Sequence, residues 1–425
     1  MNIHETIDFL KSKGRNVVYI TSVDRELEIT RLAYEHREDI LVFQPNDSNY
    51  KCVTNILSSR KDLYVLMGVE GDRDAYNKLI NSMSNPVKPE FVDFNEYFVK
   101  TDHGLKNIPF IKYFKEDGGY FLTSSIIAAC INNICNASIH RVMLIDDTRA
   151  VVRIVPRHLH YIHEQYRSDG RDTPVAIVLG VNPLIELAAA SSPPLGVYEI
   201  YVAGNLTNDP RVVKTPLYGI PVPASSSIVI EGVLSRDEVA DEGPFVDILG
   251  LVDKRRKQPV FKLNAIYVNK RFEPLVHAII PSFTEHIILM GFPREVSIYN
   301  ALIGNYDVVK IRLTQGSAGW LHAVLSIRKR REGEGIAAGL SVIHAHPSVK
   351  HVIVVDNDID IDNPMEVEWA IATRFKASEN MVVLKNMPGS TLDPRSEDGL
   401  GDKLVIDATK PLNEPWDKYR RVNIP

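Results

Sequence analysis

The sequence predicts a mixed α/β protein with an N-terminal α/β segment, a β-rich core that forms a barrel or a sandwich, and a C-terminal α/β domain. Three observations predict this class. Helical spacing alternates with strand-length apolar runs over the first hundred residues, closely spaced strands with turn signals follow, and strands alternate with helices again after Gly291. The 425 residues are 44% hydrophobic and 24% charged, which excludes disordered and collagen-like classes. We place the three parts at residues 1–105, 106–295 and 296–425.

The first part begins with Ile3, Ile7 and Leu10, whose helical spacing predicts an amphipathic opening helix. Three apolar runs of strand length follow it, and we predict that each is a buried strand. These runs are residues 16–20, 39–43 and 63–67.

The middle part contains a predicted hairpin, in which residues 142–145 and 150–155 flank an Asp-Asp turn signal. Further strands are predicted at close spacing, which is typical of a barrel or a sandwich. They are residues 176–179, 227–230 and 261–268.

The last part is predicted to contain a helix over residues 320–331, a strand over 352–355 and a helix over 366–375. The sequence Asp362-Asn363-Pro364 supplies a capping residue and an N1 proline for the last helix.

Charge and cysteine content exclude several functions. The net charge of −5 argues against a general nucleic-acid binder, and Cys52, Cys130 and Cys135 are too few for a disulfide framework. The N-terminus has neither a basic nor an apolar leader region, and no apolar run approaches 18 residues. We therefore expect a cytoplasmic protein that binds neither nucleic acid nor membrane.

Three histidines in six residues, His158, His160 and His163, suggest a metal site, because neutral imidazole is a common transition-metal ligand. The simpler alternative is that they are surface residues of a helix. One ligand from this group, completed by distant residues, is the metal arrangement that the spacing favours. The glycine pair at residues 316–319 is more typical of a tight turn than of an anion site, and the alternating aspartates 356–362 suit a strand end better than a calcium loop.

Several segments, taken in order, resemble the UbiD-type family of prenylated-flavin-dependent decarboxylases. They span roughly residues 105–415 and comprise NASIHR at 136–141, EGVL at 231–234, EGPF at 242–245, VDNDIDI at 355–361, VEWAIATR at 367–374, PGSTLDP at 388–394 and KLVIDATKP at 403–411. The resemblance implies a split β-barrel core that binds prenylated FMN, and a C-terminal domain that makes oligomer contacts.

The resemblance also implies a cofactor site. It assigns Asn136, His158 and Glu231 as ligands of a divalent metal, usually Mn²⁺, that holds the cofactor phosphate, with K⁺ as a second ion. Cofactor contacts would also come from Ser138, Ile139, Arg141 and Lys403, with Lys403 placed in a glycine-flanked loop where it reaches the phosphate.

For the chemistry, the resemblance implies that Arg141 holds the substrate carboxylate and that Glu285 donates the proton. A guanidinium binds a carboxylate through two parallel hydrogen bonds, and an acid in a dry pocket keeps its proton at neutral pH. The family's second carboxylate has no clear match, and Glu273 is the nearest upstream candidate.

The compact length and the segments at 259–260, 281–295 and 320–331 resemble a short archaeal branch of the family. The implied reaction converts trans-anhydromevalonate 5-phosphate to isopentenyl phosphate and CO2 in the archaeal mevalonate pathway. The candidates for binding the substrate phosphate are Arg153, Arg157, Lys262 and Arg294.

Two other functions stay open: decarboxylation of an aromatic acid such as a hydroxybenzoate, and a non-catalytic flavin-binding assembly protein. The expected partners are a small phosphorylated acid, a flavin prenyltransferase that supplies the cofactor, and further copies of the chain in a dimer or hexamer.

Overall fold

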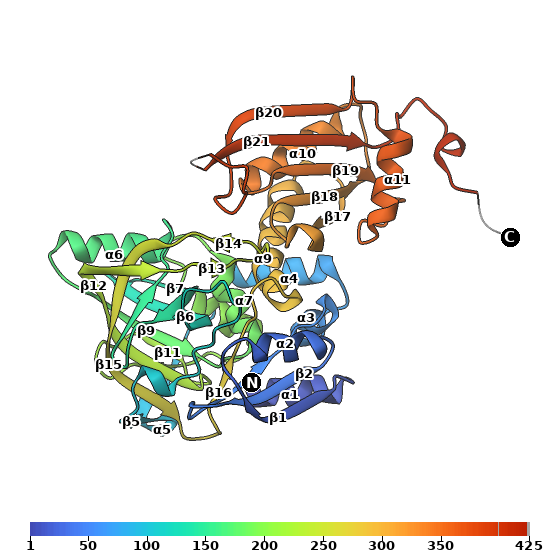
Figure 1. Ribbon diagram of the computed structural model, residues 1–425. Coiled ribbons are helices and arrows are strands. Elements are labelled where there is room, and N and C mark those ends of the chain that lie inside the picture. Colours follow the sequence, from blue (N-terminus) through green and yellow to red (C-terminus); the bar gives the residue numbers. More distant parts are fainter. Residues whose placement is uncertain (398, 423–425) are drawn as a thin grey trace. The chain divides into compact units, whose positions relative to one another are not determined.

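The computed structural model describes residues 1–397 and 399–422 as a mixed α/β fold (Figure 1). The chain divides into two compact units, residues 1–71 with 78–289 and residues 72–77 with 290–425. Helices α4 (Asp72–Ser84) and α9 (Thr284–Leu302) each contribute residues to both units.

A four-stranded sheet lies near the N-terminus of the first unit, in the order β1-β2-β3-β16. The predicted opening helix and the first two strands are confirmed. The last strand of this sheet comes from much later in the chain, so the N-terminal segment is completed by residues of the middle part. The bounds are α1 Ile3–Ser12, β1 Val17–Val23, α2 Glu28–Glu35, β2 Ile40–Pro45, β3 Lys51–Thr54 and β16 Leu275–His277.

The predicted strand over residues 63–67 is wrong, because these residues lie in helix α3 (Arg60–Met67). The Ser59 side chain accepts a hydrogen bond from the Asp62 N–H, and the Asp62 carboxylate accepts one from the Ser59 N–H. This capping box starts the helix, and Gly68 in the left-handed conformation ends it.

Six strands of the first unit close into a barrel in the order β12-β9-β6-β7-β8-β15, because β12 also pairs with β15. The predicted hairpin is confirmed as the antiparallel pair β7–β8, and the other strands predicted for the middle part all lie in this barrel. The bounds are β6 Phe121–Ile131, β7 Ile134–Leu144, β8 Arg149–Val152, β9 Thr173–Leu179, β12 Ile228–Glu242 and β15 Arg256–Asn269.

Shorter elements surround the barrel, and helix α6, which begins at His158, contacts β6, β7 and β9. The remaining bounds in this unit are β4 Glu90–Phe91, α5 Phe94–Tyr97, β5 Phe98–Thr101, α6 His158–Ser168, α7 Pro183–Ser191, α8 Glu199–Thr207, β10 Arg211–Lys214, β11 Pro221–Pro223, β13 Phe245–Val246 and β14 Val252–Asp253. A 3-10 helix spans Leu105–Asn107.

The second unit is built on a mixed sheet in the order β17-β18-β19-β21-β20. The predicted strand at 352–355 and the helix at 366–375 are confirmed, and the Asn363 side chain caps that helix by accepting a hydrogen bond from Met365 N–H. The bounds are β17 Val308–Leu313, β18 His322–Ile327, α10 Glu334–Ala345, β19 His351–Asp356, α11 Pro364–Arg374, β20 Met381–Pro388 and β21 Leu400–Ala408, with 3-10 helices at Gln315–Ser317 and Trp416–Tyr419.

The predicted helix over residues 320–331 is also wrong. Residues 322–327 form the interior strand β18, which pairs with β17 on one side and β19 on the other. Since five of its six residues are buried, its sequence shows no alternation of polar and apolar residues. Residues 316–319 form a tight turn before this strand, as predicted.

In the part of the chain that the structure describes, no helix is both long enough and apolar enough to span a membrane.

Candidate active site

Strand β7 carries a line of polar side chains at alternate positions, namely Asn136, Ser138 and His140. The Ser138 hydroxyl lies 2.9 Å from Asn136 Oδ1 and 2.8 Å from His140 Nε2. On the other side of the ring, His140 Nδ1 lies 2.8 Å from the carbonyl oxygen of Arg153. Because residues two apart in a strand share a face, these three side chains form one hydrogen-bonded row.

The row leaves an amide oxygen available to a ligand. A carbonyl oxygen can only accept, so the Nδ1–H of His140 must donate to Arg153. Burial lowers the pKa of His140 to about 4, so its Nε2 is unprotonated and can accept a hydrogen bond. The Ser138 hydroxyl donates to Asn136 Oδ1, and because an amide oxygen has two lone pairs, Oδ1 keeps one for a ligand.

Glu199 and His158 lie beside that amide. Asn136 Nδ2 donates to Glu199 Oε1 at 2.7 Å, and the N–H of Ala137 donates to Glu199 Oε2 at 2.8 Å. His158 Nδ1 lies 4.0 Å from Glu199 Oε1. Three elements contribute to this cluster: β7, the start of α6 and the start of α8.

The donor set fits a divalent cation. The Glu199 side chain is 1% exposed, and among the described residues no lysine or arginine lies within 4 Å of its carboxylate. Buried carboxylates are normally paired with a cation or bound to a metal. One amide oxygen, one imidazole nitrogen and one carboxylate suit a borderline-hard ion such as Mn²⁺.

Glu231 does not join this cluster. It lies on β12, which is separated from β7 by two strands in either direction around the barrel. Its carboxylate accepts hydrogen bonds from the N–H groups of Leu217 and Tyr218, both at 3.0 Å. The glutamate that lies beside Asn136 and His158 is Glu199, so the structure does not show the predicted grouping of Glu231 with these two residues.

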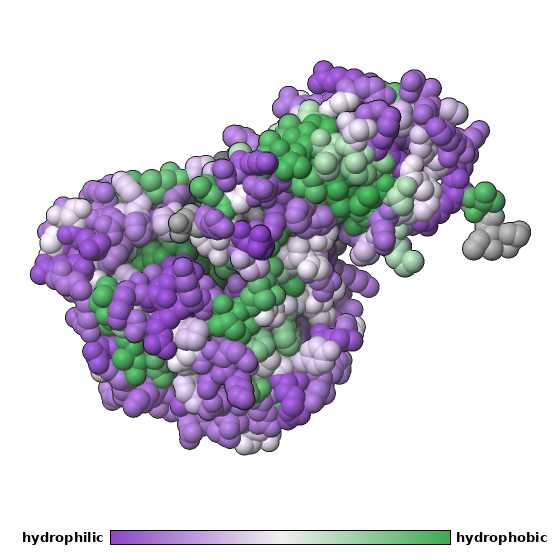
Figure 2. All heavy atoms as spheres, turned by 45° about the horizontal axis from the view of Figure 1, so that its top comes forward, coloured by the Kyte–Doolittle hydropathy of each residue, from purple (hydrophilic) through white to green (hydrophobic). Residues whose placement is uncertain are grey.

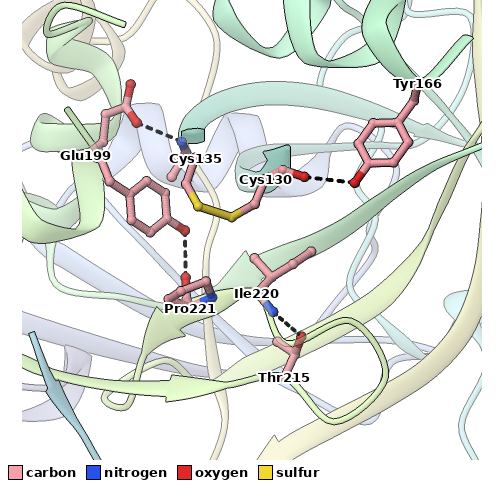
Figure 3. The surroundings of a disulfide bond; sticks show 9 residues. Cys130, Cys135, Tyr166, Glu199, Thr215, Ile220 and Pro221 are labelled. Atoms are coloured by element: carbon pink, nitrogen blue, oxygen red, sulfur yellow. Dashed lines mark hydrogen bonds between the residues drawn. A yellow bond between two sulfur atoms is a disulfide. The ribbon is translucent and has the colours of Figure 1, made fainter. Parts of the chain in front are cut away.

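A disulfide between Cys130 and Cys135 joins β6 and β7 one residue before Asn136 (Figure 3). The Tyr166 hydroxyl of α6 donates to the Cys130 carbonyl at 2.9 Å. In the same view, Glu199 points toward the backbone next to Cys135. This single disulfide is not a disulfide framework, but it fixes the strand end from which Asn136 projects. Cys52 is a free buried thiol.

A second cluster of charged groups surrounds Arg141. Its Nε donates to Glu242 Oε1 at 2.7 Å and its Nη2 donates to Glu242 Oε2 and Asp253 Oδ2, both at 2.9 Å. The Phe245 ring centroid lies 4.5 Å from the guanidinium carbon. These contacts hold the guanidinium in place. Among the residues that the structure describes, Nη1 has no partner, so its two N–H groups are still able to bind an anion.

Asp247 lies in the turn between β13 and β14 and is 5% exposed. Burial raises the pKa of this carboxyl, and Asp253 raises it further, whereas hydrogen bonds from Leu249 and Leu251 and the charge of Arg141 lower it. A buried acid with a raised pKa near an arginine that has open N–H groups is suited to deliver a proton.

Glu285 has different neighbours from those predicted. It accepts hydrogen bonds from the N–H groups of Asn55 and Leu57, and its Oε2 lies 3.0 Å from His277 Nε2. The other ring nitrogen of His277 lies 2.8 Å from Glu186. The structure therefore does not bring Glu285 to Arg141. Glu273, the other acid considered, is exposed and pairs with Lys51.

The other two histidines of the group and Ile139 have different surroundings. His160 is exposed near Glu164, whereas His163 is buried and hydrogen-bonded to Thr173, so the expectation of a surface side chain is wrong for His163. Ile139 lies on β7, between Ser138 and His140.

Lys403 is on strand β21 rather than in a loop. It is 3% exposed, and its Nζ donates to the carbonyls of Pro347 and Val349.

Glu199, Glu242 and Asp247 are the residues that sequence reasoning missed. Glu242 and Asp247 lie in or just beyond the EGPF segment that was already recognised, so the matched motif contained the signal. Glu199 stands in the first turn of a helix, where a carboxylate is usually explained by the helix dipole, and only its burial shows a different use.

Comparison with known proteins identifies the family. Residues 7–83, 87–283 and 287–408 match, respectively, the N-terminal, Rift-related and C-terminal domains of 3-octaprenyl-4-hydroxybenzoate carboxy-lyase, UbiD. The chain belongs to the UbiD family. It is a decarboxylase of the carboxy-lyase class, and the family resemblance seen in the sequence is confirmed.

Full-length relatives of this UbiD-family enzyme include two archaeal proteins. The anhydromevalonate phosphate decarboxylase of Aeropyrum pernix is 41% identical over 98% of the chain and 95% of the relative. The protein of the same name from Methanosarcina mazei is 36% identical over all of both chains. A phenolic acid decarboxylase of Bacillus subtilis is 28% identical over 86% of the chain and 81% of its own length.

Among solved structures, the UbiD-class enzyme HmfF from Pelotomaculum thermopropionicum, in complex with FMN, has a TM-score of 0.95. It is 32% identical and covers 100% of this chain and 98% of its own. An evolved dimeric form of HmfF, in complex with prFMN, has a TM-score of 0.90 at 30% identity, covering 100% of this chain and 97% of its own. The expected mixed α/β fold with a barrel is confirmed.

Proposed function

We propose that this enzyme uses prenylated FMN to decarboxylate trans-anhydromevalonate 5-phosphate, which yields isopentenyl phosphate and CO2. The observation that carries the proposal is full-length similarity to two archaeal proteins named for this decarboxylation, while a phenolic acid decarboxylase is more distant. The guanidinium of Arg141, which Glu242 and Asp253 hold in place while its Nη1 stays open, gives the proposal its chemical basis.

The cofactor phosphate would be held through a divalent ion, with Mn²⁺ as our choice, bound by Asn136, His158 and Glu199. Glu199 replaces Glu231 in this set because it is the glutamate that lies beside the other two ligands. The prenylated flavin supplies the electron sink for the decarboxylation. Ser138 and Ile139 are cofactor contacts in this proposal, whereas Lys403 is retained only as a residue of the C-terminal domain.

Arg141 would bind the substrate carboxylate through Nη1, the nitrogen that Glu242 and Asp253 leave open. Glu242 occupies the opposite edge of the guanidinium with two hydrogen bonds and so fixes its plane. Since the guanidinium cannot rotate, the carboxylate that it holds has one orientation at the moment CO2 departs.

Asp247 would then donate the proton that replaces CO2 on carbon, in the role first given to Glu285. Its raised pKa lets the carboxyl oxygen carry the proton before the reaction, and the nearby Arg141 stabilises the carboxylate afterwards.

For the whole chain we propose residues 1–105, 106–295 and 296–425 as N-terminal segment, cofactor core and oligomerisation domain. We also propose a flavin prenyltransferase as the source of cofactor, K⁺ as a second ion, a cytoplasmic location, and a dimer or hexamer as the assembly.

The test is turnover of anhydromevalonate 5-phosphate by protein reconstituted with Mn²⁺ and prenylated FMN. Turnover is measured as the formation of isopentenyl phosphate. We expect turnover with prenylated FMN and none with unmodified FMN. A hydroxybenzoic acid serves as the competing substrate. Decarboxylation of that acid alone would keep the reaction class and overturn the substrate, whereas no turnover of either acid by flavin-loaded protein would contradict the proposal.

A further inference from the structure

The hairpin of β6 and β7 carries a disulfide next to its turn. Cys130 and Cys135 lie directly opposite each other in the antiparallel register and are joined through their sulfur atoms. The two residues of the turn, Asn132 and Asn133, have φ values of 48° and 67°. Positive φ at both central residues is what the two-residue type I′ turn requires, and this turn is preferred in hairpins. The turn therefore closes the hairpin without a covalent bond.

A purely stabilising role accounts poorly for this disulfide. A disulfide stabilises a fold mainly by closing a loop of the unfolded chain, and the effect grows with the length of that loop. Cys130 and Cys135 are only five positions apart, and the turn between them already joins their strands. The position of the bond in the site points to a different role.

The disulfide lies beside the residues grouped at the candidate metal site (Figure 3). Asn136 follows Cys135 directly, and Glu199 accepts hydrogen bonds from the Asn136 side chain and from the next backbone N–H, at 2.7 and 2.8 Å. The Tyr166 hydroxyl of α6 donates to the Cys130 carbonyl at 2.9 Å, and the third residue of the site begins the same helix. One end of the hairpin thus contacts all three elements that carry the proposed metal ligands.

The same end of the hairpin is not paired with a third strand in the described part of the chain. Strand β9 pairs with β6 at residues 126–128, and β8 pairs with β7 at residues 142–144. Beyond these residues the hairpin continues as a two-stranded ribbon, which is marginally stable in water by itself. The disulfide cross-links this ribbon one residue before Asn136, so its loss would let the Asn136 amide move without unfolding the barrel.

The disulfide is also within reach of a thiol reagent. Cys130 and Cys135 are half-buried and adjoin the two exposed residues of the turn, whereas Cys52 is fully buried as a free thiol. Disulfides that are open to solvent are the labile and regulatory ones, because an attacking thiolate must reach a sulfur atom.

We propose that Cys130 and Cys135 form a reversible thiol–disulfide site, and that reduction of this disulfide weakens binding of the divalent ion at Asn136. The inference rests on the proposed function, because the ion is part of it. In the reduction, a thiolate of a dithiol attacks one sulfur, the S–S bond breaks, and the other cysteine leaves as a thiolate and is protonated. The second thiol of the dithiol then displaces the protein from the mixed disulfide. The protein gains two electrons and two protons, and the dithiol becomes a disulfide.

The experiment measures Mn²⁺ binding to the full-length protein in both redox states, from the loss of the electron paramagnetic resonance signal of free Mn²⁺. The disulfide form is prepared with oxidised glutathione and the dithiol form with dithiothreitol, and each reagent is removed under nitrogen before the titration. In denaturant, a thiol reagent should count one thiol per chain in the first form and all three in the second. We expect the Kd for Mn²⁺ to rise about 10-fold on reduction. The affinity for FMN in the presence of Mn²⁺, measured by flavin fluorescence, should fall in parallel.

Two variants locate the effect. The double variant Cys130→Ser with Cys135→Ser should bind Mn²⁺ as reduced wild type does, with or without dithiothreitol. Wild type whose two accessible thiols are alkylated after reduction replaces this variant if it does not fold. Cys52→Ala is the matched control, because it removes the third sulfur atom and should keep the difference between the two redox states.

The contrary outcomes are distinct. Equal Mn²⁺ affinity in the two redox states of wild type would overturn the inference, and so would a difference that persists in the double variant, because the reductant would then act elsewhere. A count of three thiols after oxidation would overturn it as well, since the disulfide would not form. Protein that binds Mn²⁺ in neither state would contradict the metal site of the proposed function, whereas equal binding in both states keeps that site and removes only its redox control.

Discussion

At the scale of single residues, two buried glutamates provide a direct test of the proposed metal site. Glu199→Gln removes the carboxylate that we propose as a ligand next to Asn136 and His158, so we expect Mn²⁺ affinity to fall by about 100-fold or more. Flavin retention should fall with it. Glu231→Gln is the matched control, because it changes an equally buried glutamate whose carboxylate accepts hydrogen bonds from the N–H groups of Leu217 and Tyr218. Metal and flavin content, measured on purified protein, would contradict the assignment if Glu231→Gln lost the metal and Glu199→Gln kept it.

Two substitutions, one of an acid near Arg141 and one of an acid far from it, distinguish an effect on catalysis from an effect on stability. Asp247→Asn cannot donate a proton to carbon, and we expect kcat to fall by about 10²- to 10⁴-fold with little change in flavin binding.

Glu285→Gln leaves His277 buried with one carboxylate fewer, so it should lower the free energy of unfolding by about 3–5 kcal/mol. Its kcat, measured below the unfolding transition, should stay within a few-fold of wild type. The opposite pattern would return Glu285 to the proton-donor role.

The sequence predicted part of this site, and the reason for the limit is physical. Asn136 and His158 were predicted as a pair, and the structure brings them together through a shared neighbour, Glu199. The choice between Glu199 and Glu231 depends on which part of the barrel each lies near, because Glu199 begins helix α8, which packs against β7, whereas Glu231 is on β12. A linear sequence carries no signal for that, because both are buried acids on elements of ordinary pattern.

At the scale of elements, the errors come from apolar runs whose pattern does not distinguish a helix from a strand. The short apolar run at residues 63–67 is compatible with a helix and with a strand. The Ser59–Asp62 capping box before it indicates a helix. Strand β18 lacks alternation because both its faces are covered, and the basic residues that follow it imitate a helix end. Amphipathic elements such as α1, and α11 with its Asn363-Pro364 start, were predicted because their signals are local.

A buried ion triad connects three elements of the first unit and gives a pH prediction. His277 on β16 lies between Glu186 of α7 and Glu285 of α9, and these two carboxylates raise the pKa of His277 to about 10 against the effect of burial. A raised pKa in the folded state contributes stability that is complete below the unfolded value of about 6.5 and is lost as the pH rises toward 10. We therefore expect the free energy of unfolding to decline between pH 7 and pH 10.

Denaturant titration at several pH values measures that decline. Glu186→Gln removes one carboxylate, so His277 should lose its proton at lower pH and the decline should begin earlier. The exposed Glu273→Gln serves as the control and should leave the profile as in the wild type. An identical pH profile in wild type and Glu186→Gln would show that His277 is already neutral.

At the scale of the whole molecule, the C-terminal unit exposes apolar side chains on the edge strand of its sheet. Figure 2 shows a hydrophobic area gathered on this unit. Strand β20 is the edge strand of its sheet, and Met381 and Val383 on it are 43% and 50% exposed. Exposed apolar side chains on an open edge strand are typical of a surface that another chain covers.

This surface provides the test of the proposed oligomer. A lysine on an edge strand opposes edge-to-edge pairing, so Val383→Lys should reduce the molar mass measured by light scattering from that of a dimer or hexamer toward that of a single chain. Ala372→Lys adds the same charge at an exposed position of α11, outside β20, and should leave the mass unchanged. If wild type has the mass of one chain, the proposed assembly fails. If wild type is an oligomer and Val383→Lys keeps the wild-type mass, the chains associate through another surface, because a buried lysine without a partner would not be tolerated at the interface.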